Sequence, residues 1–463
     1  MRDVTSGQDL SHQWRAMDTD RLVRQTAVRQ SDRVPDRMSV AIQAGRFLII
    51  LILLLGLFTV SAFSFMFERR RDQFIDTPGY LILPVPYSYP GIGTGLVLVG
   101  YAGNMFETQT DAILLGFNGD AEGYYLLVNE IFLVDRFLFL NASHMGISKF
   151  GVTMYSSRGM DTDQEDYNTF VGDKYQQSQV RAIMTLLDRR LEFWYQMDDW
   201  AARATDIYDP DENLIRHYDN PDEMGSRETA YGVQLDLTDD RTDPRSGIRL
   251  KQTSTRHPAD ADDEPDYDIL TRSATLYIPI FEDSTWVFHY TRSDATVRRE
   301  GNTDITAIAI EKGIGFCPYL PDQQGCEAAI LSDAQNTAAA NKYGSSLSLG
   351  GAYRLRSYPE GRYKGAHTEL RGTEFRWNFN TKNSKIDLYF LKDIVHAFQL
   401  AFFWEEGSVS ETEADLGKIT RSSYGGGFRF VAESGNVYRL DWATGEEGSQ
   451  LTMLFQYPWG ESD

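Results

Sequence analysis

The sequence predicts an all-β fold, a transmembrane antiparallel β-barrel. Between residues 368 and 459 apolar and polar residues alternate in repeated runs, and the chain closes on Leu451, Met453, Phe455 and Tyr457 with mostly polar or small partners between them. Alternation with period two is the pattern of strands that have lipid on one face and water on the other. Only helices and closed barrels satisfy every backbone hydrogen bond in a bilayer, and no second helix-length apolar run exists.

The composition fits this fold and limits the possible partners. Only 42% of the 463 residues are hydrophobic, which is sufficient because a barrel strand needs about 9 to 11 residues, half of them polar. The formal net charge of -22 argues against binding to nucleic acid. Acidic residues are concentrated in segments such as 206–222 and 260–268. We expect these segments to be exposed loops on the outer side of the membrane.

The uncharged segment 47–67 is interpreted as part of an export signal. Its apolar core ends at Val60 and is followed by Ser61-Ala62, so residues 1–62 are predicted to be a signal peptide cleaved after Ala62. The core begins unusually far from residue 1, and Met38 is therefore the expected true start. An uncleaved inner-membrane anchor is the alternative, because the uncharged stretch has helix-spanning length.

Three parts of the chain follow from these patterns. After the signal peptide we expect a short periplasmic lead-in at 63–90 and an outer-membrane barrel at 91–463, which includes a long loop at 298–365. Alternating runs predict fifteen strands near residues 92–101, 108–117, 123–133, 135–143, 176–187, 189–203, 228–238, 247–256, 267–280, 285–297, 367–379, 395–406, 420–431, 436–443 and 449–458. Single-chain bacterial barrels have even strand counts, so we expect sixteen, with 151–156 or 304–310 as the missing strand.

The two cysteines, Cys317 and Cys326, lie nine residues apart in the long loop. In an exported protein a close, even pair favours a disulfide over a metal site, particularly since no histidine or further cysteine lies nearby. We therefore expect a disulfide, and neither a metal ion nor a cofactor.

Strand parity predicts which side chains face the lumen. In one run Phe375 and Trp377 share a face, which leaves Glu374 and Arg376 on the other, and the same reasoning applies to the later strands. The charged residues assigned to the lumen in this way are Glu374, Arg376, Glu405, Arg429, Arg439 and Asp441. Opposite charges in a partly dry barrel pair with one another, and an arginine from an inward-folded loop can join them through bidentate contacts.

These residues resemble the BamA/TamA superfamily of outer-membrane barrels, the bacterial surface antigen type. Members carry a loop with a Val-Arg-Gly-Tyr/Phe tip that folds into the lumen, and Leu355-Arg356-Ser357-Tyr358 stands in that place after Gly350-Gly351. Further matching segments are Tyr87-Ser88-Tyr89-Pro90 before Gly93-Thr94-Gly95, Asp239 to Gly247, Thr373 to Arg376, Phe402 to Gly407, Gly425 to Arg429, and Arg439 to Ala443. Two departures are Ser357 in place of the tip glycine and the lack of POTRA repeats. The chain therefore resembles the branch without N-terminal POTRA domains.

The resemblance and the parity together define a loop latch made of Arg356, Glu374, Glu405 and Tyr358. In this interpretation Arg356 holds the loop while the first and last strands part for a substrate. The alternative is a salt-bridged lining, formed with Arg376, Arg429, Arg439 and Asp441, that only keeps the barrel shut.

The expected function is non-enzymatic translocation or insertion of protein or lipid, together with outer-membrane homeostasis in a Gram-negative bacterium. Outer-membrane lipids and a periplasmic or membrane protein are the expected partners, and the chain is expected to be a monomer or small homo-oligomer. A passive pore is one alternative. An outer-membrane hydrolase is another, although the sequence has no Gly-x-Ser-x-Gly or His-Glu-x-x-His motif and offers only a lone candidate, His289.

Overall fold

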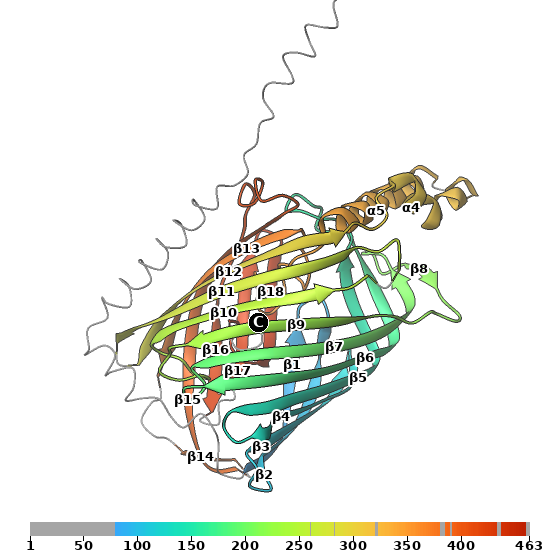
Figure 1. The fold of residues 1–463 in the computed structure, drawn as a ribbon. Helices are drawn as coiled ribbons and strands as arrows, with labels where there is room; N and C mark the ends of the chain where they lie inside the picture. The colour runs from blue at the N-terminus through green and yellow to red at the C-terminus, as the bar shows by residue number, and fades with distance from the viewer. Residues whose placement is uncertain are drawn as a thin grey trace, which may run out of the picture. The chain divides into compact units, whose positions relative to one another are not determined.

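The computed structural model describes residues 79–259, 261–281, 283–319, 323–379, 385–388, 391–432 and 437–459. These residues form a closed antiparallel barrel in which each strand pairs with its neighbours and the last strand, β18, pairs with the first, β1 (Figure 1). The barrel strands are β1 (Gly79–Tyr89), β2 (Gly93–Met105), β3 (Thr110–Gly119), β4 (Glu122–Val134), β5 (Leu138–Tyr155), β6 (Tyr167–Leu186), β7 (Leu191–Tyr208), β9 (Met224–Asp236), β10 (Gly247–His257), β11 (Asp266–Phe281), β12 (Ser284–Arg299), β13 (His367–Asn378), β15 (Leu391–Ser410), β16 (Arg421–Ala432), β17 (Val437–Gly445) and β18 (Gly448–Phe455).

Two further strands lie outside the ring. Strands β8 (Leu214–His217) and β14 (Lys385–Leu388) extend hairpins, because β7 pairs directly with β9 and β13 pairs directly with β15. The ring itself therefore has sixteen strands among the described residues, and the expected number is confirmed.

The sixteenth strand is β1, not one of the two proposed runs. The expectation that 63–90 is a lead-in was wrong for residues 79–89, which pair with β2 along their whole length. The sequence did not predict this strand because it contains Pro84 and Pro86, and proline within a run normally argues against a strand. Residues 151–156 instead fall at the end of the long strand β5, and 304–310 fall mostly in a helix.

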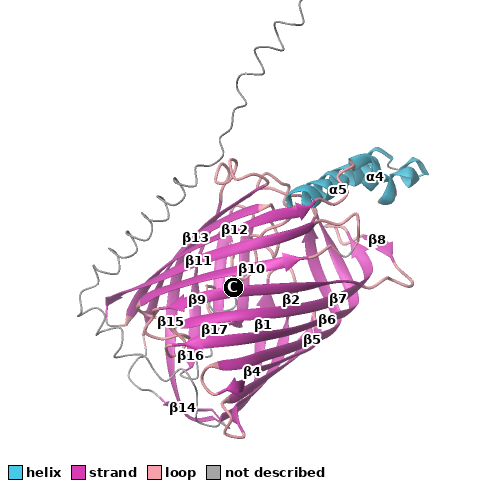
Figure 2. Cartoon of the chain, in the orientation of Figure 1, coloured by secondary structure: helices cyan, strands magenta, loops and turns pink. Residues whose placement is uncertain are grey.

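The long connection between β12 and β13 begins with a helical hairpin. It contains α4 (Ile305–Glu311), the 3-10 helix η1 (Ile314–Tyr319) and α5 (Gln323–Tyr343), which lie together at one end of the barrel (Figure 2). Helix α4 begins after Asp304, whose carboxylate accepts from the backbone N–H groups of Thr306 and Ala307. Sequence patterning missed these helices because α5 buries only alanines, Ala334 and Ala338. Cys317 and Cys326 form a disulfide within this hairpin.

The barrel wall has many exposed apolar side chains on its outer face and a buried face that is polar on the C-terminal strands. Large apolar side chains exposed on the outer face include Leu96, Leu98, Leu114, Tyr195, Tyr231, Trp286, Phe288, Trp377, Phe402, Trp404, Tyr424, Phe428 and Trp442. On β13 the alternate residues Glu374, Arg376 and Asn378 are buried and polar, whereas on β2 the alternate residues Val97 and Val99 are buried and apolar. Of the helices within the described ranges, none has the length and apolarity needed to cross a membrane.

Successive connections alternate between the two ends of the barrel. The β12–β13 connection, the β7–β9 connection with β8, and the β10–β11 connection therefore share one end. The acidic segments 206–222 and, as far as the structure describes it, 261–268 consequently lie at the same end as the helical hairpin. The predicted signal peptide 1–62, the proposed start at Met38 and the first part of the lead-in, 63–78, lie outside the described residues.

Candidate functional site

Residues 345–366, which follow the helical hairpin, form a compact luminal loop. Backbone hydrogen bonds in both directions between Leu349 and Tyr363 close its base, at 2.9 and 3.1 Å. Gly350 has φ +108°, and a Cβ there would lie 2.0 Å from the carbonyl oxygen of Pro359. Only glycine allows this approach, and the turn directs the tip, with Arg356, toward the barrel wall.

Arg356 is fully buried and contacts carboxylates on three wall strands. Its Nε donates to Glu405 Oε1 at 3.0 Å, and its backbone N–H donates to Glu405 Oε2 at 2.9 Å. Its Nη1 donates to Glu374 Oε2 at 3.2 Å and to Asp441 Oδ2 at 2.9 Å. One loop side chain thus connects β13, β15 and β17.

The contacts of Arg356 belong to a larger luminal charge network. Its members are Arg356, Arg376, Arg429, Arg439, Glu374, Glu405 and Asp441, all with no more than 1% of their surface exposed. Arg429 binds Glu374 through both guanidinium Nη atoms at 2.7 and 2.6 Å, and Arg376 Nε donates to Glu374 at 2.7 Å. Four arginines face three carboxylates, so the network holds one excess positive charge.

Aromatic rings lie against this excess charge. The Arg356 guanidinium carbon is 3.3 Å from the centre of the Phe403 ring, and that of Arg376 is 3.9 Å from the centre of the Tyr457 ring. A guanidinium over a desolvated aromatic face is stabilised by the ring quadrupole, by about 2 kcal/mol. The rings therefore supply part of the stabilisation that a fourth carboxylate would give.

Other groups of the loop near Arg356 also form hydrogen bonds with the wall. The Ser357 N–H donates to Ser423 Oγ at 3.0 Å, and the Tyr358 hydroxyl donates to the Ser422 carbonyl at 3.3 Å. Arg439 Nη2 donates to the Ala352 carbonyl of the loop at 2.6 Å. The whole tip, and not only one side chain, is therefore seated on β16 and β17.

A second set of contacts holds the loop near the end of the barrel that carries the hairpin. Arg362 binds Glu447 through Nε and Nη2 at 2.8 and 2.7 Å. Arg158, from the β5–β6 connection, donates through Nη1 to Ser345 Oγ at the start of the loop, at 2.7 Å, and also binds Glu411 at 2.6 and 2.9 Å. Lys364 donates to the Tyr155 carbonyl at 2.9 Å, and burial lowers the pKa of its ammonium group. Release of the loop therefore requires both sets of contacts to break.

The C-terminal tail enters the lumen from the opposite end. Strand β18 ends at Phe455, and Gln456, with φ +77°, turns the chain inward. Tyr457 and Trp459 are 5% and 2% exposed, so the last strand ends before the predicted residue 458 and Tyr457 lies in the lumen. The Tyr457 hydroxyl donates to Asp243 at 2.8 Å.

Trp459 lies directly beneath the site of Arg356. Its ring stacks on His289 at a centroid distance of 5.1 Å, and the Arg356 guanidinium lies 5.5 Å from its ring centre. A Cβ at Gly372 would meet the Trp459 ring at 2.3 Å, so glycine on β13 makes room for this side chain. His289 also bonds the hydroxyls of Thr275 and Thr291, which accounts for it as a structural residue.

The first and last strands, β1 and β18, meet at a seam that has fewer paired residues than the neighbouring strand pairs of the barrel wall. It has one registered residue pair, Ser88 with Met453, whereas β17 pairs with β18 along all of β18. The Pro86 carbonyl accepts from the Tyr438 hydroxyl at 2.7 Å, which places the backbone polar groups of Pro86 toward the seam. The backbone carbonyl of Pro84, two residues earlier in the strand, points to the same side. Neither proline has an N–H to donate, so two backbone bonds are missing there.

The structure brings together all the residues proposed for the latch and the network. Arg356, Glu374 and Glu405 are in direct contact, Tyr358 contacts the wall nearby, and Arg376, Arg429, Arg439 and Asp441 surround them. Sequence reasoning missed the direct bond from Arg356 to Asp441 and the roles of Phe403, Tyr457 and Trp459. Parity placed Phe403 inside, but no pattern indicated that an arginine would lie on its ring.

The chain is similar in fold to solved outer-membrane barrels, but its sequence matches no known family. No family model and no curated protein matches the sequence. Similar solved structures are BamA from Haemophilus ducreyi lacking POTRA domains 1–3 (12% identity, TM-score 0.44, covering 86% of this chain and 77% of that one) and CdiB from Escherichia coli (11%, 0.42, 84% and 68%). CdiB from Acinetobacter baumannii is another (9%, 0.42, 84% and 65%). Likenesses at these TM-scores support no conclusion about function, and membership of the BamA/TamA superfamily stays a prediction.

Proposed function

We propose that this chain is a non-enzymatic outer-membrane barrel of the BamA/TamA type that translocates or inserts a protein or lipid. The observation that carries the proposal is the attachment of the luminal loop. Arg356, the residue that connects three wall strands, belongs to the loop and not to the wall. The ion pairs of the network that involve Arg356 therefore form only when the loop lies in the lumen.

Energetics favour a releasable contact over a purely structural one. A buried ion pair contributes little net stability compared with well-packed apolar residues, because both charges lose their hydration. A lumen built only for stability would not need seven buried charges with one positive charge in excess. Charges that recover their hydration when the loop leaves lower the cost of opening, and this supports a gate.

The seam supports the same proposal. With one registered pair and two prolines directed toward it, β1 and β18 separate at less cost than any neighbouring pair whose backbone bonds run along a whole strand. A parted seam exposes unpaired strand edges, which a client strand can pair with. The apolar outer face supports a location in the outer membrane of a Gram-negative bacterium, with its lipids and a periplasmic or membrane protein as partners.

A passive pore is the second candidate, and a specific cavity favours it. A space of about 190 Å³ remains beside the luminal loop, lined mainly by hydroxyl and cationic side chains. Its lining includes Thr253, Thr271, Thr291, Lys251 and Arg354. Steady conductance of the wild-type barrel with its loop in place would favour this function.

Crosslinking the seam tests the proposed function. The double variant Ser88→Cys, Met453→Cys places two cysteines on directly opposed residues of β1 and β18. The matched control is Leu83→Cys, Val99→Cys, an opposed pair on β1 and β2. Opposed residues in antiparallel strands lie at Cα distances of about 4.5 to 5.5 Å, within the range that a disulfide spans.

The readout is growth of a deletion strain that carries each variant, on medium containing detergent, with and without reductant. We expect the oxidised seam variant to fail like the empty vector, reductant to restore it, and the control pair to grow like wild type in both conditions. If the oxidised seam variant grows like wild type, the seam does not open in function. The passive pore would then be the better account.

A further inference from the structure

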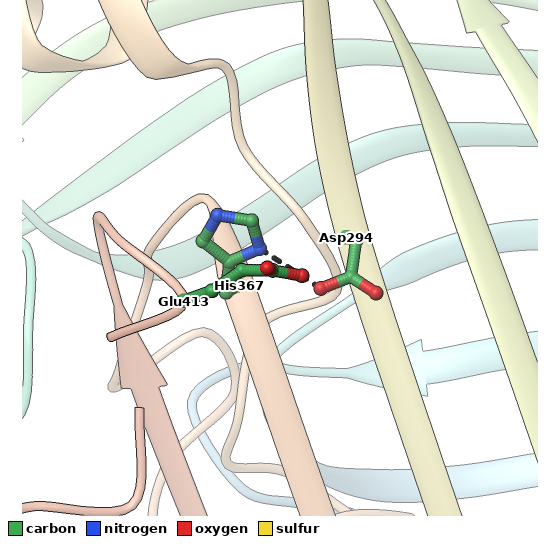
Figure 3. Close-up of side chains that lie close together, drawn as sticks. All are labelled: Asp294, His367 and Glu413. Atoms are coloured by element: carbon green, nitrogen blue, oxygen red, sulfur yellow. Dashed lines mark hydrogen bonds and ion pairs between the residues drawn. The ribbon is translucent and has the colours of Figure 1, made fainter. Parts of the chain in front are cut away.

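A histidine and two carboxylates converge where the luminal loop joins the barrel wall. Asp294 lies on β12, His367 is the first residue of β13, and Glu413 lies in the β15–β16 connection (Figure 3). One ligand atom from each lies within 4.8 Å of the other two. The three residues are far apart in sequence, so no spacing motif reveals the cluster.

From this geometry we infer a binding site for a zinc-type divalent cation at Asp294, His367 and Glu413. Imidazole nitrogen with carboxylate oxygen is a donor set that Zn²⁺ accepts, with three protein ligands and a fourth position left for water. Ca²⁺ and Mg²⁺ prefer sites made of oxygen alone, so they fit this set less well.

Arg292 supplies the positive charge that holds the two carboxylates together. Its Nε and Nη2 contact Asp294 Oδ1 at 2.7 and 2.6 Å, and its Nη2 lies 3.3 Å from Glu413 Oε1. Asp294 Oδ2 takes no part in these contacts and is the oxygen through which Asp294 would bind the ion. Arg292 then stays bonded to Oδ1, in the way that carboxylate ligands commonly accept a hydrogen bond from an outer residue.

His367 Nδ1 already points at the carboxylates, 2.8 Å from Asp294 Oδ1. In the metal-bound form Nδ1 gives up this contact with Oδ1 and binds the ion, which Asp294 holds through Oδ2, and the imidazole carries its proton on Nε2. This exchange needs a ring tautomer change but no movement of the backbone.

A cavity lies on the His367 side of the cluster. A space of about 350 Å³ lies beside the cluster and is lined by residues that include His367, Glu411, Ala366, Arg298 and Lys342. Because His367 directly follows the luminal loop, an ion here joins β12, β13 and the β15–β16 connection at the point where the loop leaves the lumen.

Calorimetry with the untagged full chain in detergent, titrated with ZnCl2, tests the site. Wild type is expected to bind one Zn²⁺ in a saturable step that His367→Ala removes. Glu413→Gln is expected to weaken binding by at least about 10-fold, because even outer partners of metal ligands contribute 10- to 100-fold. His144→Ala is the matched control, since His144 bonds Ser178 on another part of the wall, and it should bind like wild type.

Co²⁺ absorption gives an independent readout, because a tetrahedral nitrogen and oxygen site produces visible bands that disappear in His367→Ala. The Glu413 side chain is 75% exposed, so Glu413→Gln keeps the test decisive if His367→Ala does not fold. The inference is overturned if wild type shows no saturable Zn²⁺ binding, or if Glu413→Gln and wild type bind equally. Either outcome leaves the proposed translocation function untouched.

Discussion

Replacing Arg356 by alanine is expected to loosen the tip of the luminal loop from the wall and open the lumen while the barrel still assembles and the Arg362–Glu447 contact stays in place. The substitution removes the loop side chain that contacts Glu374, Glu405 and Asp441. The remaining network would have three arginines and three carboxylates, yet Glu405 would lose the cation that it binds. Removing one partner of a buried pair costs about 3 to 5 kcal/mol, because a buried charge is left uncompensated.

Planar-bilayer conductance and protease sensitivity of the loop measure this effect. Arg356→Ala should raise the conductance and expose residues 345–366 to protease, and urea unfolding in detergent should show the lower stability. Arg356→Lys should fall between alanine and wild type, because an ammonium cannot hold several carboxylates in one plane.

Arg371→Ala is the control for Arg356→Ala. It removes an arginine of β13 whose side chain is 59% exposed and paired with Glu369, and surface pairs contribute only about 0 to 1 kcal/mol. If Arg356→Ala and Arg371→Ala leave conductance equally unchanged, the loop is not held by its arginine and the latch is wrong.

Most of the barrel could be predicted from strand parity, because parity depends only on neighbouring residues in the sequence. Each residue of a strand faces opposite to its neighbour, so Glu374 and Glu405 could be placed in the lumen without knowing how β13 and β15 are arranged. The same rule failed at β1, where Pro84 and Pro86 interrupt the pattern. Proline is tolerated there because its backbone faces the seam, and that position is a property of the closed barrel.

Contacts between distant segments could not be predicted from parity. Arg356 and Asp441 are 85 residues apart, and only closure of the ring brings β17 beneath the loop. The alternation of β18 continues through Tyr457, yet the backbone turns at Gln456 and carries Tyr457 and Trp459 inside. The metal-site candidate at Asp294, His367 and Glu413 was missed for the same reason, since its three residues come from separate elements.

Replacing Trp459 by alanine is expected to loosen the loop from the opposite end of the lumen. Trp459 is 2% exposed, stacks on His289 and lies under Arg356, so its loss leaves a void beneath the latch. Truncation of a buried tryptophan costs about 3 to 5 kcal/mol, because burial is lost and the cavity does not fully collapse. Water entering that void would rehydrate Arg356 and weaken its contacts with the wall.

Conductance and urea unfolding of Trp459→Ala measure this prediction, with Trp442→Ala as control because Trp442 is 52% exposed on the outer face. Trp459→Ala should raise the conductance and lower the unfolding midpoint, whereas Trp442→Ala should leave the conductance at the wild-type level. Gly372→Val offers a second route, since its side chain would displace the Trp459 ring while Trp459 itself is retained. If both variants conduct like wild type, the tail does not support the loop, and the loop's own contacts with the wall hold the lumen closed.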